Sequence, residues 1–195
     1  MTQTVKRSTG IPGLDLTLDG GFPVGGRIVV YGSPLSGLHL MAKQFWRTES
    51  DDTGSYLMLD ADVEPGMVDA GRLSTRELAA SLEGDRIVVD SLSTLLLRDG
   101  MDAAYEFFTQ AARSALERQA NIMYILYQGL HTPWEEARLM RAADIFIILR
   151  EELHGNEFER TLAVQKIRGM QVPQRVVPFH MMPKGLELST TSRVV

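Results

Sequence analysis

The chain has 195 residues, of which 44% are hydrophobic and 23% charged, a composition that excludes a disordered, collagen-like or low-complexity protein. Its formal net charge of −5 and scattered basic residues make nucleic acid an unlikely partner. No cysteine is present, the four histidines lack paired ligand spacing, and no window holds the ~20 apolar residues of a membrane span. We therefore expect a cytoplasmic protein with no metal site and no membrane span, folded as a single domain over residues 1–195.

Five short apolar runs predict buried strands. Their hydrophobicity is continuous rather than alternating, which is typical of a parallel sheet covered on both faces. The runs are residues 27–31, 55–59, 86–90, 121–126 and 145–149. Apolar residues at helical spacing in 38–47 and 102–119 predict helices between them, so strand and helix alternate as in βαβ units.

The pattern changes in the last quarter of the chain. Residues 160–167 and 175–181 alternate polar and apolar side chains, and Gly169 and Pro173 separate the two segments. This alternation predicts an antiparallel hairpin at the edge of the sheet. The expected fold class is a three-layer α/β domain with a mostly parallel central sheet and a C-terminal antiparallel hairpin.

A glycine-rich loop follows the first predicted strand. In a P-loop, backbone N–H groups wrap phosphates at a helix N-terminus, a lysine neutralises the terminal phosphates and a Ser or Thr hydroxyl binds magnesium. The candidate cofactor-binding loop comprises Gly32, Ser33, Pro34, Leu35, Ser36, Gly37, Leu38 and His39. Both glycines have the required spacing, but Leu38 stands at the lysine position and His39 at the hydroxyl position. The alternative is a tight strand-to-helix connection with no ligand.

Four landmarks in chain order resemble KaiC-like and RadA-like ATPases of the RecA superfamily. Residues 8–15, Ser-Thr-Gly-Ile-Pro-Gly-Leu-Asp, and residues 18–25 resemble the family's opening phrase, and the loop resembles a degenerate Walker A motif. Residues 86–92 resemble the Walker B strand, where the family's aspartate, here Asp90, orients the magnesium water; a helix N-cap or a turn residue after the strand is the alternative for Asp90. Lys166 and Arg168 match basic residues that reach the nucleotide of the neighbouring subunit, with a solvated hairpin edge as the alternative.

This resemblance implies a RecA-like P-loop NTPase fold, and it exposes a second departure. The family has two consecutive acidic residues after its second strand, which activate the attacking water. Here Leu59 is followed by Asp60 and Ala61, so the first acid is shortened and the second is lost. Asp60 and Asp90 are therefore interpreted as vestigial catalytic residues, because a displacement near 1 Å reduces a rate by on the order of 100-fold.

Three functions remain as hypotheses. The first is a pseudo-ATPase, not an active enzyme, that acts as a scaffold or regulatory subunit and forms a homo-oligomer or a hetero-oligomer with an active family member. The second is a sensor that binds ATP or ADP without hydrolysis, using His39 or a neighbour's Lys166 and Arg168 as replacement charge. The third is a recombinase-accessory module that binds single-stranded DNA through loops at 98–102 and 128–141. The candidate residues of the second loop are His131, Trp134, Arg138 and Arg141, with Glu135 and Glu136 opposing them.

Overall fold

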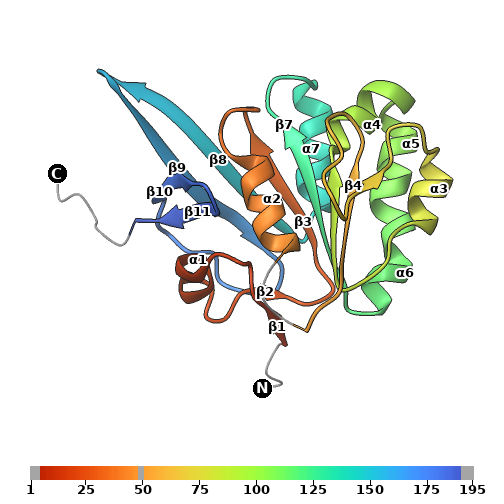
Figure 1. The fold of residues 1–195 in the computed structure, drawn as a ribbon, viewed down its shortest axis with the longest axis horizontal. Helices are drawn as coiled ribbons and strands as arrows, with labels where there is room; N and C mark the ends of the chain where they lie inside the picture. The colour runs from red at the N-terminus through yellow and green to blue at the C-terminus, as the bar shows by residue number, and fades with distance from the viewer. Residues whose placement is uncertain (1–4, 48–50, 190–195) are drawn as a thin grey trace.

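A computed structural model describes residues 5–47 and 51–189 (Figure 1). The strands are β1 (Lys6–Arg7), β2 (Phe22–Pro23), β3 (Arg27–Gly32), β4 (Gly54–Met58), β5 (Val68–Asp69), β6 (Arg86–Asp90), β7 (Asn121–Tyr127), β8 (Ile145–His154), β9 (Glu157–Ile167), β10 (Val177–Met182) and β11 (Gly185–Leu188). The helices are α1 (Pro12–Thr17), α2 (Leu38–Trp46), α3 (Thr75–Ala80), α4 (Leu92–Asp99), α5 (Met101–Glu106), the π-helical η1 (Phe107–Ala111), α6 (Ala112–Glu117) and α7 (Pro133–Ala142). Across these residues, none of the helices is long and apolar enough to cross a membrane.

A mixed sheet of nine strands, in the order β11-β10-β9-β8-β3-β7-β6-β4-β5, forms the centre of the domain. The strands from β8 to β5 in this order pair in parallel, and β8, β9, β10 and β11 pair antiparallel. The five predicted strands are confirmed as β3, β4, β6, β7 and β8. Because parallel strands point the same way, β3, β4 and β6 end at the same edge of the sheet, the carboxyl edge.

Two apolar clusters make the domain three layers deep. One cluster packs α1, α2 and the β10–β11 hairpin on one face of the sheet, and the other packs α3 to α7 on the opposite face (Figure 1). Each core strand alternates its side chains between these clusters: Val30 faces α2, whereas Val29 faces the other layer. The predicted three-layer α/β class is therefore confirmed.

The prediction of antiparallel C-terminal strands is confirmed, but the two predicted segments pair with each other only over a short stretch. The two predicted segments lie in β9 and β10, which pair antiparallel at only Leu162↔Val177 and Thr161↔Pro178. Instead, β9 forms a long hairpin with β8, and β10 forms a second one with β11. The cause is an unpredicted extension of β8 beyond residue 149, through residues that are polar except for Leu153. Gly155, with φ 62°, supplies the left-handed conformation in the turn that follows.

Candidate functional site

The glycine-rich loop lies at the carboxyl edge, between β3 and α2. Gly37 precedes the first turn of α2 with φ 92°, a left-handed conformation that favours glycine. A Cβ on Gly32 would lie 2.4 Å from the carbonyl oxygen of Leu149, so only glycine fits there as well. The two glycines kept from the P-loop pattern are therefore explained by backbone geometry alone.

The hydrogen-bond donors of Ser36 in this loop are turned inward. Ser36 is buried, and both its hydroxyl and its backbone N–H donate to the carbonyl oxygen of Ser33, at 2.7 Å and 3.0 Å. Leu38 is 1% exposed and packs in the apolar cluster under α2, whereas His39 is exposed. The position that a lysine fills in a phosphate clamp is thus occupied by a core side chain.

Asp90 ends β6 as a buried carboxyl group, 3% exposed. Its Oδ2 accepts a 2.5 Å hydrogen bond from the Tyr56 hydroxyl on the neighbouring β4, while its Oδ1 has no partner among the described residues. The pKa of Asp90 is raised to about 6: burial is the main cause, the hydrogen bond from Tyr56 opposes it, and the nearby charge of Asp60 adds to it. Burial, followed by the charge of Asp90, also raises the pKa of Tyr56. The aspartate predicted to face magnesium is instead covered by a tyrosine.

Asp60 lies beside Asp90, but it is exposed and held by hydroxyl groups. It accepts hydrogen bonds from Ser91, at 3.0 Å, and from Thr94. Ser91 is also the N-cap of α4, where its hydroxyl accepts from the Thr94 backbone N–H. The alternative assignment of Asp90 as the helix N-cap is therefore wrong, because the cap is the next residue.

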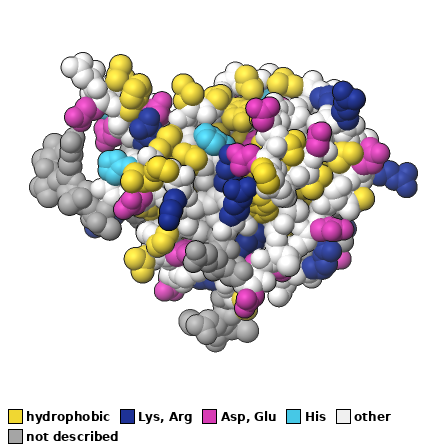
Figure 2. Space-filling view, viewed as in Figure 1, with side chains coloured by type: hydrophobic (Ala, Val, Ile, Leu, Met, Phe, Trp, Pro, Cys, Tyr) yellow, Lys and Arg dark blue, Asp and Glu magenta, His cyan; other side chains and the backbone are white. Residues whose placement is uncertain are grey.

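The exposed side of α2 carries charges that sequence patterns did not single out. Lys43 binds Glu64, from the segment after β4, at 2.5 Å, and Arg47 lies 3.6 Å from the same carboxylate. His39, Lys43 and Arg47 are spaced four residues apart and so share one face of the helix. In Figure 2, basic, acidic and histidine side chains gather over α2. Their helical spacing could have identified this basic face from the sequence, but Glu64 is too far along the chain for its pairing with Lys43 to be predicted.

The β10–β11 hairpin covers the start of α2. The Gln44 side-chain amide donates to the Leu186 carbonyl oxygen at 3.1 Å and accepts from its N–H at 2.7 Å, as a neighbouring strand would. A Cβ on Gly37 would lie 2.9 Å from Met181 Cε and 3.2 Å from Leu186 Cδ2. The hairpin therefore packs directly against the glycine that ends the loop.

Lys166 and Arg168 lie at the opposite, amino edge of the sheet, where β9 ends beside the start of β8. The Lys166 ammonium donates to the carbonyl oxygens of Met140 and Arg141 at 3.1 Å and 2.8 Å, at the C-terminus of α7. Arg168 is exposed and donates to Asp144 at 2.9 Å. Within one chain neither residue meets the loop, so the predicted role toward a neighbouring subunit stays a prediction.

Ser93 and His131 form a polar pair close to this site that has the form of a nucleophile and base. The His131 Nε2 lies 2.8 Å from Ser93 Oγ, and burial lowers the pKa of His131. However, Ser93 is 1% exposed, and its Oγ also accepts from the Tyr127 backbone N–H at 2.8 Å. The pair therefore fixes the end of β7 and leaves no room for a substrate at the hydroxyl.

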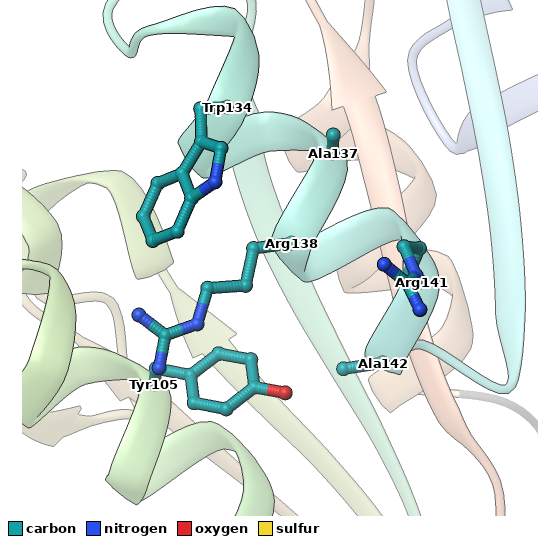
Figure 3. A pocket seen from close by; sticks show the side chains of 6 residues that line it. All are labelled: Tyr105, Trp134, Ala137, Arg138, Arg141 and Ala142. Carbon is teal, nitrogen blue, oxygen red and sulfur yellow. The ribbon is translucent and has the colours of Figure 1, made fainter.

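The predicted DNA-binding loop at 128–141 is mostly helix. Thr132 and Glu135 form a capping box, with Pro133 in the first turn, and this local pattern starts α7. Trp134 and Arg138 project from the helix toward Tyr105 on α5, beside a cavity of about 490 Å³ (Figure 3). The other predicted segment, 98–102, joins the end of α4 to α5. The aromatic and basic side chains are together, but on a rigid helix.

The residues at the carboxyl edge do not fit a magnesium–triphosphate. Leu38 supplies no charge, Ser36 is bonded within the loop, and Tyr56 covers one oxygen of Asp90. Within residues 5–47 and 51–189, no group of three or more His, Asp or Glu side chains is arranged to hold a metal ion. The arrangement supports burial and packing rather than phosphate chemistry.

Comparison with known proteins supports the fold independently. A KaiC-like protein from the hyperthermophilic archaeon Pyrococcus horikoshii OT3 superposes with a TM-score of 0.76 over 96% of this chain and 100% of that chain, at 18% sequence identity. The domain therefore has a KaiC-like RecA fold. No curated protein matches the chain. A family model matches residues 6–191, and the chain belongs to that family, the family of unknown function DUF7125.

Proposed function

We propose that this protein is a catalytically degenerate RecA-type domain that acts as a scaffold or regulatory subunit with little or no ATP hydrolysis. The observation that carries the proposal is the burial of Leu38 in the apolar core, at the position where a phosphate clamp needs a cation. A single preorganised donor to developing charge is worth roughly 3–4 kcal/mol in a transition state. The absence of such a donor at Leu38, together with His39 in place of the magnesium-binding hydroxyl, explains why this RecA-type fold would hydrolyse little or no ATP.

The covered aspartate supports the same proposal from the other side of the loop. Asp90 Oδ2 and Tyr56 share a 2.5 Å hydrogen bond inside the sheet, so a metal-bound water at this oxygen would have to displace a buried tyrosine hydroxyl. Trp46 of α2 packs edge-on against the Tyr56 ring, with 5.2 Å between the centroids, and holds it in place. The role that follows is assembly in the cytoplasm, with further copies of the chain or with an active relative.

Hydrolysis and nucleotide binding test this proposal separately. We expect magnesium-dependent ATP turnover at background level, equal in the wild type, in Asp90→Ala and in the matched control Asp62→Ala, which changes an exposed aspartate. Turnover clearly above background that Asp90→Ala removes and Asp62→Ala keeps would overturn the proposal.

Calorimetry with ATP and with ADP distinguishes the scaffold from the second hypothesis, the sensor. We expect no heat of binding and no shift in melting temperature for a scaffold. Saturable nucleotide binding without turnover would favour the sensor over the scaffold. Lys43→Met should weaken such binding, because Lys43, the lysine of α2 that pairs with Glu64, would then supply charge to the nucleotide.

A further inference from the structure

A cavity of about 490 Å³ lies between α5 and α7, on the sheet face opposite α2 (Figure 3). Its volume is in the range of sites that bind small organic molecules. The side chains that line it are Tyr105, Trp134, Ala137, Arg138, Arg141 and Ala142. The two alanines are small, so the surface of α7 stays open between its larger side chains. The cavity therefore has aromatic and basic walls around an apolar floor.

The Arg138 guanidinium in this cavity is held in place. It lies 4.0 Å from the ring centroid of Tyr105 and 5.3 Å from that of Trp134, and its Nη1 donates to Asp102 at 3.0 Å. Tyr105 in turn packs against the apolar cluster under α5 and α7. Among the described residues, Nε and Nη2 of Arg138 have no hydrogen-bond partner. A planar guanidinium that is already positioned loses little freedom when it binds an anion.

The acidic residues of α7 do not neutralise the cavity. Glu135 forms the capping box with Thr132, and Glu136 accepts from the Tyr31 hydroxyl at 2.9 Å and 3.0 Å. Both carboxylates are thus bound elsewhere. The Arg141 guanidinium, by contrast, has neither a hydrogen-bond nor an ion-pair partner within the part of the chain that the structure describes. An unpaired cation at the wall of a cavity favours an anionic ligand.

The net charge of the cavity favours a carboxylate over a phosphate. Arg138 and Arg141, together with the Asp102 carboxylate, give a formal charge of +1. A carboxylate carries one negative charge, whereas a phosphate monoester carries close to two at neutral pH. The bond between Arg138 and Asp102 also shows that a carboxylate oxygen reaches this guanidinium. The cavity therefore matches an organic monoanion.

The Trp134 indole adds a surface for an aromatic ring. It is 65% exposed, and Trp134, Arg138 and Arg141 are spaced four and three residues apart, on one side of α7. Trp134 and Arg141 are two turns apart, about 10 Å along the helix axis, and long side chains on a helix reach back toward its N-terminus. A ligand that contacts both needs a short spacer between its ring and its carboxylate.

We propose that the cavity between α5 and α7 binds a small aromatic carboxylate. Its ring packs on the Trp134 indole, and its carboxylate accepts hydrogen bonds from the guanidiniums of Arg141 and Arg138. Guanidinium and carboxylate are both planar and form parallel N–H···O bonds, so the pairing is directional as well as charged. This site is separate from the glycine-rich loop and goes beyond the proposed scaffold role.

Two-dimensional proton–nitrogen NMR of the full chain tests the site, with phenylbutyrate as the probe. The chain has two tryptophans, Trp46 and Trp134, and the indole N–H signal that is lost in Trp134→Ala belongs to Trp134. We expect this signal to shift saturably, with a dissociation constant of about 0.1–1 mM, while the Trp46 signal stays unchanged. Phenylbutyramide lacks the charge and butyrate lacks the ring, so each should bind at least about 10-fold more weakly.

Matched variants assign the two contacts. Arg141→Gln and Trp134→Ala should each weaken phenylbutyrate binding at least about 10-fold, as measured by calorimetry and by the remaining NMR shifts. Arg76→Gln changes an exposed arginine on α3, and Phe158→Ala changes an aromatic residue that is 59% exposed on β9; both should bind like the wild type.

Three results would overturn the proposal. The first is the absence of a saturable shift at the Trp134 indole, and the second is equal binding of the acid and its amide. The third is tighter binding of AMP or of labelled single-stranded DNA that Trp134→Ala abolishes, because the cavity would then be a phosphate site. None of these measurements depends on ATP turnover, so the proposed function stands or falls separately.

Discussion

The two edges of the parallel sheet are built differently. At the amino edge, charges are paired: Arg86, 1% exposed, donates to Asp52 at 2.9 Å and to the carbonyl oxygens of Ser8 and Phe45. Further along this edge, the Arg27 guanidinium forms a salt bridge with Asp144 at 2.9 Å. Burial raises the pKa of Asp144, but the hydrogen bonds and charge of Arg27 and the charge of Arg168 lower it more, so the net shift is downward. This edge ties the N-terminal segment to the sheet.

At the carboxyl edge, a buried carboxylate is left half satisfied. Asp90 has one oxygen bonded by Tyr56 and one without a partner among the described residues, and its pKa is raised. Open α/β sheets place their ligand sites at this edge, where selection acts on function rather than on stability. The difference teaches that the carboxyl edge is not satisfied like an ordinary core, which gives four ways to test the contrast.

The largest effect is expected at the amino edge. Arg86→Met keeps the aliphatic stem but removes the donors to the carbonyl oxygens of Ser8 and Phe45 and one of the cations that bind Asp52. We expect the free energy of unfolding to fall by about 4 kcal/mol, because breaking a buried ionic network leaves its polar groups unsatisfied. Urea denaturation measures this. Arg118→Met, which removes one donor to the Leu82 carbonyl oxygen, is the control and should lose about 1 kcal/mol or less.

The carboxyl edge should respond in the opposite direction, with a pH dependence. The pKa of Asp90 rises from 3.8 to about 6 on folding, so the folded chain binds more protons in that interval and its stability falls as pH increases through it. Asp90→Asn has no carboxyl to titrate and so avoids this loss of stability, while its amide oxygen still accepts the hydrogen bond from Tyr56. We expect the variant to be more stable by up to about 3 kcal/mol above pH 6 and equal to the wild type below the ordinary pKa of aspartate.

Thermal unfolding from acid to neutral pH measures the Asp90 effect. Asp62→Asn, at an exposed position, serves as the matched control and should give no pH-dependent gain. A difference between Asp90→Asn and wild type that is the same at every pH would contradict the account of a buried charge at this edge.

The sequence predicts the sheet well and the site less well, for physical reasons. Buried parallel strands are continuous apolar runs, so β3 and β6 are visible in the sequence. Tyr56 reads as one more buried strand residue, because its hydroxyl partner Asp90 is 34 positions away and the pairing of β4 with β6 brings them together. Residues 150–154 of β8 are polar except for Leu153 and pair only with β9, so no apolar pattern marks them as strand.

A smaller effect is expected at the loop glycine. Gly37→Ala introduces a side chain at φ 92° and places its Cβ 2.9 Å from Met181 Cε, so strain and packing both oppose it. We expect a loss of about 2 kcal/mol in chemical denaturation. Gly129→Ala is a matched control with φ 81° and nothing within 4 Å, and it isolates the backbone contribution. Equal losses for both variants would show that the hairpin does not constrain the loop.

The smallest expected effect tests whether Lys166 stabilises its own chain or contacts a neighbouring subunit. Lys166→Met removes an ammonium from two carbonyl oxygens at the C-terminus of α7, where a cation also interacts favourably with the helix dipole. We expect the free energy of unfolding to fall by about 1 kcal/mol, with Lys184→Met, at an exposed position, unchanged as the control. Sedimentation velocity of the same variant completes the test. Unchanged stability with lost association would assign Lys166 to a neighbouring subunit, as the family resemblance predicts, and the amino edge would then be an interface as well as a structural tie.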